Sequence, residues 1–123
     1  MNLLLDTHVL LWWSDEQRIS PEAFEAISDP DNIVYVSAAS IWEISIKSAR
    51  GKLEVDDAIF DVRSDDFEPL PITHADARQA GSLPDHHRDP FDRMLVAQAL
   101  AHDLVLVTRA PEIQLYGANI LPA

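Results

Sequence analysis

The sequence predicts an α/β fold in which helices cover both faces of a mostly parallel β-sheet. Short runs of leucine, isoleucine and valine, each bounded by polar or turn-forming residues, are typical of buried parallel strands. Segments with helix-capping residues lie between these runs, and strands separated by helices favour parallel pairing. The clearest apolar runs occupy residues 3–5, 33–36 and 104–107.

In the first half of the chain, three helices are expected between and after the first strands. One directly follows the first strand, one has a Ser-Pro start, and one runs from a serine cap to a glycine behind a basic last turn. These helices are expected over residues 9–13, 20–28 and 37–50, with a turn at 29–32 before the second strand.

The second half contains one weak and one strong strand signal. Two prolines limit the segment 67–72 to a short edge strand at best, whereas 104–107 is a clear buried strand. Helices are expected at 56–63, at 73–80 behind a threonine cap, at 91–102 and at 111–116, with a loop at 81–90 and a final strand at 120–121.

Length and composition fit one folded domain over residues 1–123. Hydrophobic residues make up 47% of the 123 residues, which allows a packed core. The absence of cysteine excludes disulfides and thiolate metal sites and is compatible with a reducing cytoplasm. The start of the chain lacks the basic region of a signal peptide, and no apolar run approaches the roughly 18 residues of a membrane span. We therefore expect a soluble cytoplasmic protein with no membrane partner.

The net charge of −12 argues against broad electrostatic capture of nucleic acid, which normally needs a basic face. It does not exclude a nucleic-acid substrate, because carboxylates can hold cations that in turn meet phosphate. An acidic surface also suits a basic protein partner.

Three acidic residues stand out as candidate catalytic and metal-binding groups. Asp6 follows the first strand, where the ligand crevice of open parallel sheets lies. Glu43 shares a face with Ala39 and Ile46 of an expected helix, and Asp92 begins an apolar stripe of another. Each also has a structural alternative: Asp6 as a helix cap, Glu43 as the i, i+4 partner of Lys47, and Asp92 as a capping acid.

We expect Asp89 to supply the cap and Asp92 to point inward, because Asp92 shares the apolar stripe. Carboxylates within about 4–6 Å raise one another's pKa, and hard divalent cations such as Mg²⁺ or Mn²⁺ relieve that repulsion. Such ions activate water and clamp phosphate oxygens, so the expected chemistry is phosphodiester hydrolysis.

The remaining polar and aromatic residues give weaker signals. His86 and His87 lack a zinc motif and are expected to be solvated, while His8 could assist Asp6 or contact substrate. The tryptophans are expected to belong to the core. No nucleotide-binding or serine-hydrolase signature occurs.

Four segments together resemble PIN-domain ribonucleases of the VapC toxin type. They are Leu-Leu-Leu-Asp-Thr-His at 3–8, Ser-Ala-Ala-Ser-Ile-Trp-Glu-Ile at 37–44, Asp-Pro-Phe-Asp-Arg-Met-Leu-Val-Ala-Gln-Ala at 89–99, and Leu-Val-Thr-Arg at 106–109. The resemblance spans nearly the whole chain. It implies a three-layer α/β/α sandwich with about five strands and places the family's acidic residues on Asp6, Glu43 and Asp92.

The same resemblance implies Mg²⁺- or Mn²⁺-dependent cleavage of RNA by a homodimer, held in check by an antitoxin from the same operon. One position departs from the family pattern, because Thr108-Arg109-Ala110 stands where Thr-Arg-Asp is usual. A fourth carboxylate is therefore missing, and Asp89, Thr108 and Glu112 are the possible secondary groups. Arg93 and Arg109 could contact RNA phosphate, or could be surface or salt-bridging residues.

Two other functions remain open. Ala110 and the acidic surface favour a catalytically weak PIN-like module that only binds a protein partner. A receiver-like phosphoacceptor would need an aspartate ending a middle strand and a lysine after the last strand. The second strand ends at Ser37 instead, and no lysine follows Lys52.

Overall fold

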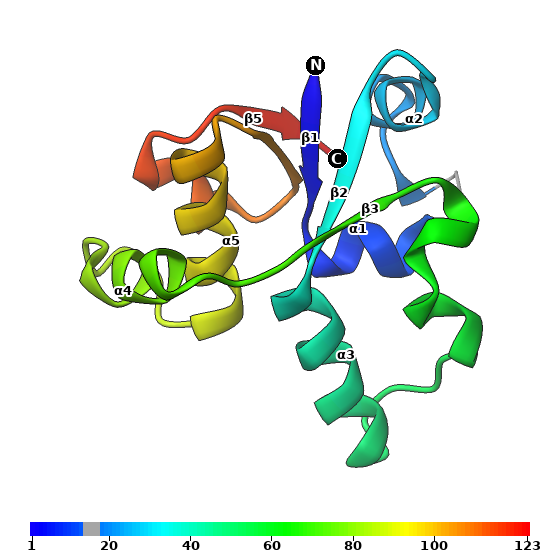
Figure 1. The fold of residues 1–123 in the computed structure, drawn as a ribbon, viewed down its shortest axis with the longest axis horizontal. Coiled ribbons are helices and arrows are strands. Elements are labelled where there is room, and N and C mark those ends of the chain that lie inside the picture. Colours follow the sequence, from blue (N-terminus) through cyan, green and yellow to red (C-terminus); the bar gives the residue numbers. More distant parts are fainter. Residues whose placement is uncertain (14–17) are drawn as a thin grey trace.

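The computed structural model, which describes residues 1–13 and 18–123, is built around a parallel sheet with strand order β3-β2-β1-β4-β5 (Figure 1). β1 lies at the centre, where Leu3 pairs with Val34 on one side and Val105 on the other. The order differs from the 2-1-3-4-5 of receiver-like folds. The strands are β1 (Asn2–Leu5), β2 (Ile33–Ser37), β3 (Glu68–Leu70), β4 (Val105–Thr108) and β5 (Ile120–Pro122).

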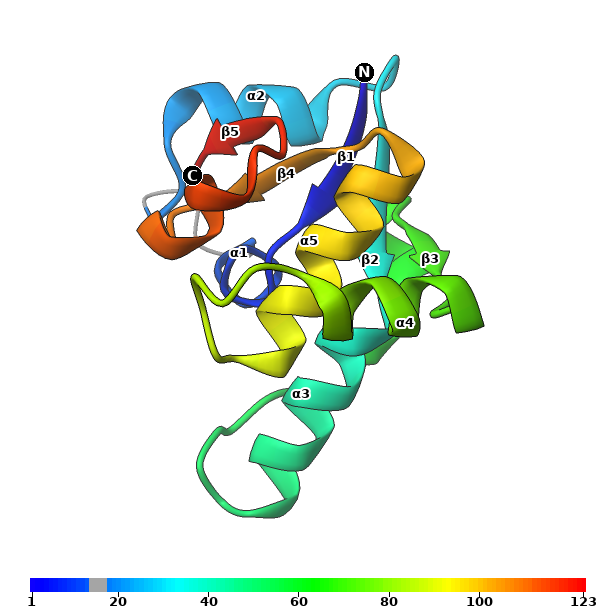
Figure 2. The same ribbon diagram turned by 90° about the vertical axis from the view of Figure 1, so that its left-hand side faces the viewer.

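Helices cover both faces of this sheet, as the sequence predicts (Figure 2). The first two helices pack on one face and the last two on the other, while the third extends beyond the carboxyl ends of the strands. The helices are α1 (Thr7–Trp12), α2 (Pro21–Ser28), α3 (Ala38–Ala49), α4 (His74–Ser82) and α5 (Pro90–His102). The three-layer α/β/α fold class is confirmed.

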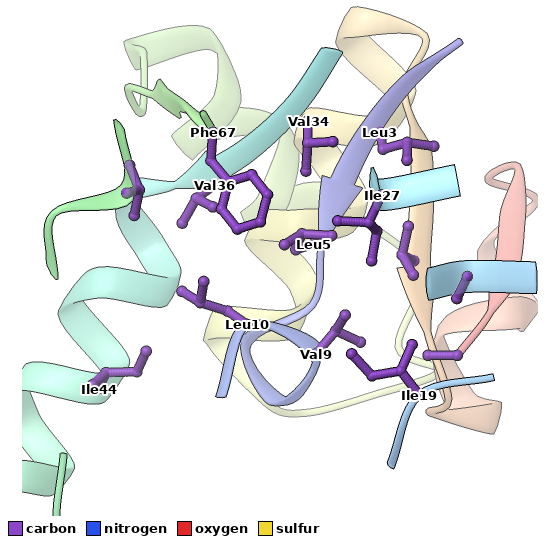
Figure 3. Close-up of a cluster of buried hydrophobic side chains, with 14 residues drawn as sticks. Leu3, Leu5, Val9, Leu10, Ile19, Ile27, Val34, Val36, Ile44 and Phe67 are labelled. Atoms are coloured by element: carbon purple, nitrogen blue, oxygen red, sulfur yellow. The ribbon is translucent and has the colours of Figure 1, made fainter. Parts of the chain in front are cut away.

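The leucines of β1 explain why this strand is central. Successive side chains of a strand point to opposite faces, and Leu3, Leu4 and Leu5 are all fully buried. Leu3 and Leu5 pack with α1, α2 and Phe67 on one face (Figure 3), whereas Leu4 packs against α5 on the other. A continuous apolar run is therefore needed here, and an alternating one would leave one face without a core.

Two of the expected helices have a different form. Residues 56–63 are not one helix but parts of two 3₁₀ turns, η2 (Asp57–Phe60) and η3 (Val62–Asp65). Asp56 caps the first turn, and Asp61 leaves helical geometry with ψ of 75°. Aspartates hydrogen-bond nearby backbone groups and so favour short turns over continuous helix. The last helix, η4 (Pro111–Tyr116), is likewise 3₁₀.

The exposure of Trp42 also differs from expectation. Trp12 and Trp13 are partly buried against the core, but Trp42 is 60% exposed and packs edge-on against Phe91. Its helix, α3, leaves the sheet after its first turns, so this face of the helix has no sheet to cover it.

Within the described ranges, no helix combines the length and apolar character that crossing a bilayer requires.

Candidate metal centre at the carboxyl ends of the strands

Asp6 lies at the junction of β1 and α1 and is 3% exposed. Its Oδ1 accepts the backbone N–H of His8 at 2.8 Å, which makes Asp6 the N-cap of α1, and its Oδ2 accepts a hydrogen bond from Thr108 Oγ1 at 2.6 Å. The helix therefore begins at Thr7, two residues before the expected start. Capping and a functional role are compatible for this residue, because the capping carboxylate still lies at the carboxyl end of β1.

The hydrogen bonds of Asp6 favour its charged form. Burial acts to raise the pKa of Asp6, but the hydrogen bonds from His8 and Thr108 outweigh burial and lower it below the usual value. The His8 ring Nδ1 lies 3.4 Å from Asp6 Oδ1, and this contact is the main reason that the pKa of His8 is raised. Asp6 is thus a fixed, ionised carboxylate.

Glu43 is brought to Asp6 by the start of α3. Ser37 ends β2 and caps α3, and buried Thr7 Oγ1 donates to Ser40 Oγ at 2.9 Å, which ties α1 to the first turn of α3. Glu43, one turn further on, is 3% exposed. Its Oε2 pairs with Lys47 Nζ at 2.8 Å, whereas its buried Oε1 has no hydrogen-bond partner within the described residues.

Asp92 lies in the first turn of α5, and Asp89 caps that helix by accepting the N–H groups of Phe91 and Asp92. The division of roles expected between the two aspartates is therefore correct. Asp92 Oδ2 shares a hydrogen bond of 2.7 Å with His87 Nε2. Burial, aided by the charges of Asp6 and Asp89, raises the pKa of Asp92 to about 6, and the bond to His87 acts in the opposite direction.

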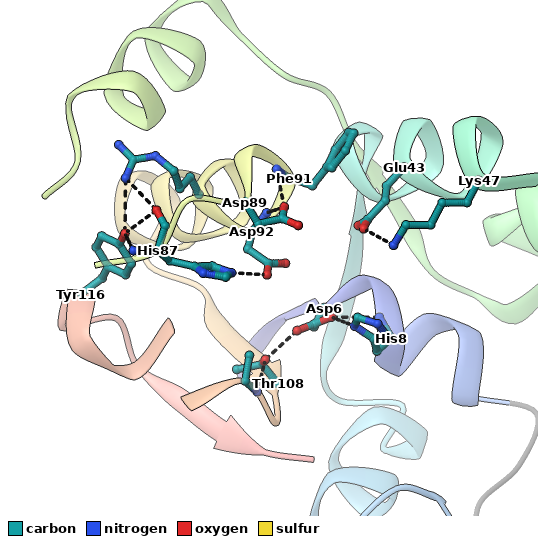
Figure 4. Close-up of polar contacts among 12 residues, drawn as sticks. Asp6, His8, Glu43, Lys47, His87, Asp89, Phe91, Asp92, Thr108 and Tyr116 are labelled. Atoms are coloured by element: carbon teal, nitrogen blue, oxygen red, sulfur yellow. Dashed lines mark hydrogen bonds and ion pairs between the residues drawn. The ribbon is translucent and has the colours of Figure 1, made fainter. Parts of the chain in front are cut away.

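We call Asp6, Glu43, Asp89 and Asp92 the acidic cluster. Figure 4 shows the carboxyl groups of Asp6, Glu43 and Asp92 turned toward one another from α1, α3 and α5. The charge of Asp6 acts on Asp92, and Lys47 is attracted by Glu43, Asp89 and Asp92 together. Even so, no group of three His, Asp or Glu side chains in the described part of the chain is arranged to hold a metal ion as it stands.

The secondary candidates take different positions. Thr108 is fully buried and bonded to Asp6, and its Oγ1 also accepts the N–H of Ala110 at 3.1 Å. A hydroxyl thus lies beside Asp6, two residues before Ala110. Glu112 is exposed in the first turn of η4.

The two arginines considered as RNA contacts donate to the protein's own backbone. Arg93 donates to the carbonyls of Ala80, Leu83, Pro84 and His87, which fixes the loop before α5.

Arg109 donates to the carbonyls of Arg18 and Ala123 and lies 4.5 Å from the centre of the Trp12 ring. These contacts favour a structural role for both arginines.

A cleft of about 830 Å³ opens beside the acidic cluster. His8 and Lys47, which contact Asp6 and Glu43, lie at its wall together with Lys52 and Arg18. The chain has only two lysines, and both line this cleft. Three acidic residues, Glu54, Asp56 and Asp65, also line it.

Sequence reasoning missed His87, which was expected to be solvated. The loop that carries it is held by Tyr116, whose hydroxyl accepts the His87 N–H at 2.9 Å, and by Arg93. The side chain of His87 is 22% exposed because this loop folds back over the start of α5. Tyr116 lies 29 positions from His87 in the sequence, so only the His-Arg-Asp-Pro-Phe-Asp spacing could have indicated the contact of His87 with Asp92.

The chain matches the family model described as PIN domain over residues 3–116. It is 32% identical over 112 residues to "Ribonuclease VapC22" of Mycobacterium tuberculosis, covering 87% of this chain and 85% of that protein.

Solved structures share the fold. VapBC2 from Rickettsia felis, bound to a promoter DNA fragment, superposes with a TM-score of 0.73 at 13% identity, over 99% of this chain and 98% of that one. A toxin–antitoxin complex from Klebsiella pneumoniae gives a TM-score of 0.68 at 20% identity, over 97% and 95% of the two chains. By its sequence match over nearly its whole length, with a fold that agrees, the chain belongs to the PIN domain family and is of the VapC type.

Proposed function

We propose that this chain is a metal-dependent endoribonuclease that hydrolyses RNA phosphodiester bonds and acts as the toxin of a type II toxin–antitoxin pair. The name of its relative, a VapC ribonuclease, and the toxin–antitoxin complexes among its structural neighbours support this proposal. The observation that carries it is Glu43 Oε1, a buried carboxylate oxygen without a partner in the described residues, beside Asp6 and Asp92. Leaving such an oxygen unpaired costs free energy, which a bound cation would recover.

The donor set of the acidic cluster fits Mg²⁺ or Mn²⁺. All of its candidate ligands are carboxylate oxygens, which hard divalent cations prefer, and no cysteine is available for softer metals. We propose Asp6, Glu43 and Asp92 as the metal-binding and catalytic residues, with Asp89, Thr108 and Glu112 as secondary candidates. When bound, such an ion would lower the pKa of a water molecule and neutralise phosphate charge.

Neighbouring side chains hold the three carboxylates in place through hydrogen bonds and an ion pair. Thr108 and His8 hold Asp6 ionised, and His87 holds one oxygen of Asp92 and opposes the rise of its pKa. Lys47 holds Oε2 of Glu43 and leaves Oε1 available. Because all three acids come from helices docked on one sheet edge, their positions are set by rigid elements rather than by loops.

The substitution at Ala110 supports a second candidate function, a binding module without turnover. The side chain of Ala110 has no oxygen that could bind a metal ion, and its backbone N–H donates a hydrogen bond to Thr108 Oγ1. Titration of Mg²⁺ and Mn²⁺ with a panel of RNAs separates the two functions. Metal binding with RNA cleavage supports the nuclease, and absence of both supports the binding module.

The decisive variant is Asp6→Asn, which keeps the shape of the side chain and removes its charge. We expect RNA cleavage to be abolished, while the circular-dichroism spectrum and cooperative unfolding are retained. Asp31→Asn, at an exposed turn away from the sheet edge, is the matched control and should cleave like the wild type. Full cleavage by Asp6→Asn would remove the proposed function.

We further propose a cytoplasmic protein whose residues 1–123 act as one domain, as a homodimer neutralised by a cognate antitoxin. A small basic protein encoded next to this chain would be the expected antitoxin, because the chain carries a net charge of −12. Expression of the chain with and without that neighbour, followed by light scattering of the purified complex, tests both partners.

A further inference from the structure

Lys47 lies between the acidic cluster and the cleft. Its Nζ is 2.8 Å from Glu43 Oε2, yet its side chain is 44% exposed and lines the cleft together with His8 and Lys52. One end of the contact is therefore buried at the cluster, and the other is reachable from solvent. Figure 4 shows the Lys47 ammonium group on the side of Glu43 that faces Asp6 and His8.

This ion pair differs from an ordinary i, i+4 pair on a helix surface. An exposed pair of that kind contributes little to stability, because solvent and salt screen it. Here the carboxylate is 5% exposed, so its charge requires a partner inside the protein. Lys47 is also attracted by Asp92 of α5 and by Asp89, which caps that helix, so one ammonium group interacts with acids from separate parts of the chain.

Lys47 offsets one of the four negative charges of the acidic cluster, which lowers the attraction of the cluster for a second divalent ion. The cluster holds four carboxylates, two of which, Asp6 and Asp89, also cap helices. Lys47 already offsets the charge of Glu43, and Ala110 supplies no additional carboxylate. Glu43 Oε1 has no partner within the described residues, and Asp6 and Asp92 keep lone pairs beside the hydrogen bonds that they accept.

We propose that Lys47 is the built-in second cation of the acidic cluster: it neutralises Glu43, limits the cluster to one divalent ion, and presents its ammonium group to a phosphate in the cleft. The phosphate contact rests on the proposed nuclease function, whereas the neutralisation of Glu43 and the limit to one divalent ion concern the cluster alone. A lysine suits this position because its ammonium group is a compact point charge that binds phosphate as well as carboxylate.

Calorimetric titration with Mn²⁺ tests the role of Lys47 at the cluster without any RNA. We expect the wild type to bind one equivalent. Lys47→Gln keeps a hydrogen-bond donor for Glu43 but removes the charge, so it should bind Mn²⁺ at least about tenfold more tightly or take up a second equivalent. Lys47→Arg keeps the charge and should bind one equivalent with an affinity close to that of the wild type.

The matched control is Lys52→Gln, which removes the chain's other lysine from the same cleft. It should change Mn²⁺ affinity by no more than about twofold to threefold, because Lys52 is exposed and its charge is screened by solvent and salt. Circular dichroism establishes that each variant is folded before titration. Two equivalents in the wild type, or equal effects of the two glutamine variants, would overturn the proposal.

The phosphate contact is measured by fluorescence anisotropy of a labelled single-stranded RNA, with Ca²⁺ replacing Mg²⁺ to suppress cleavage. Lys47→Gln should weaken binding by about fivefold or more, and Lys47→Arg should restore it. If the wild type binds no RNA, the nuclease function and the phosphate contact both fail. The Mn²⁺ titration still decides the role of Lys47 at the cluster.

Discussion

Thr108 Oγ1 donates a hydrogen bond of 2.6 Å to Oδ2 of Asp6, and this bond joins the carboxyl ends of the adjacent strands β4 and β1. Both residues are buried, and they lie 102 positions apart in the sequence. The bond is one of the contacts that lower the pKa of Asp6. It therefore couples the packing of the sheet directly to the charge state of the candidate metal ligand.

Replacing Thr108 by valine tests this coupling. The shape of the side chain is kept, but Asp6 loses a donor worth about 1.5–3 kcal/mol for a charged acceptor. We expect the free energy of unfolding to fall by about that amount, and Mn²⁺ affinity to fall several-fold. Thr108→Ser retains the hydroxyl and should remain near the wild type in both urea unfolding and calorimetry. Equal behaviour of the two variants would contradict the importance of the bond.

The pH dependence of stability should reflect Asp92. Its pKa is raised from 3.8 to about 6 in the folded chain, so the folded state holds the proton more strongly than the unfolded state. The metal-free protein is therefore favoured by this residue below pH 3.8 and loses that contribution as the pH rises through about 6. The loss is on the order of 3 kcal/mol, since one pKa unit corresponds to roughly 1.4 kcal/mol.

A divalent cation should reverse this trend, because it binds the ionised carboxylate. We expect Mn²⁺ to raise the melting temperature more at pH 7.5 than at pH 5. In Asp92→Asn, which cannot ionise, the part of this pH dependence that comes from Asp92 should be absent. A melting-temperature increase that is the same at both pH values in the wild type would speak against Asp92 as a ligand.

Arg93 separates a structural role from an RNA-binding role. Its guanidinium group donates to backbone carbonyls at the end of α4 and in the loop that follows, a geometry that a lysine cannot reproduce. We expect Arg93→Lys to lower the free energy of unfolding by about 1–3 kcal/mol, because part-buried carbonyls lose their donors. Arg88→Lys, at an exposed neighbouring position, is the control. Weaker RNA binding by Arg93→Lys at unchanged stability would instead favour a contact with RNA.

Asp76 should make α4 sensitive to acid. Burial acts to raise its pKa, but bonds from the Thr73 backbone, Gln98 and the Thr73 side chain outweigh burial and lower it. Its contribution to stability is therefore present above pH 3.8 and is lost as the pH falls through the lowered pKa. Asp76→Ala should remove the capping box and cost about 1–2 kcal/mol at pH 7, measured by urea unfolding. A cost that persists undiminished at pH 2.5 would contradict this account.

The sheet and its long helices could be predicted because local signals and burial agree. The buried leucines of β1 and the serine cap of α3 each specify one structure within a few residues. The prediction of a helix over residues 56–63 was wrong because its aspartates allow either a helix or short turns. The sequence does not show which backbone groups these aspartates bind. The prediction that Trp42 belongs to the core was wrong, because its exposure depends on how far α3 extends beyond the sheet. Only the tertiary arrangement sets that extent.

The acidic residues of the candidate site could be proposed from the sequence, but the residues that hydrogen-bond to them could not. Asp6, Glu43 and Asp92 each follow from a strand end or an apolar helical face. The contacts of Asp6 with Thr108 and of His87 with Tyr116 link residues that are 102 and 29 positions apart, so periodicity gives no sign of them. The contact of Lys47 with Glu43 was visible as a spacing, but the unpartnered oxygen opposite it was not.

The pairing of β1 with β4 also has a consequence for protein synthesis. Thr108, the partner of Asp6 on β4, is synthesised 102 residues after Asp6. During translation the nascent chain holds an incomplete centre that lacks the last anchor of its first carboxylate. A function that depends on the fixed Asp6 carboxylate would therefore begin only after β4 has paired with β1.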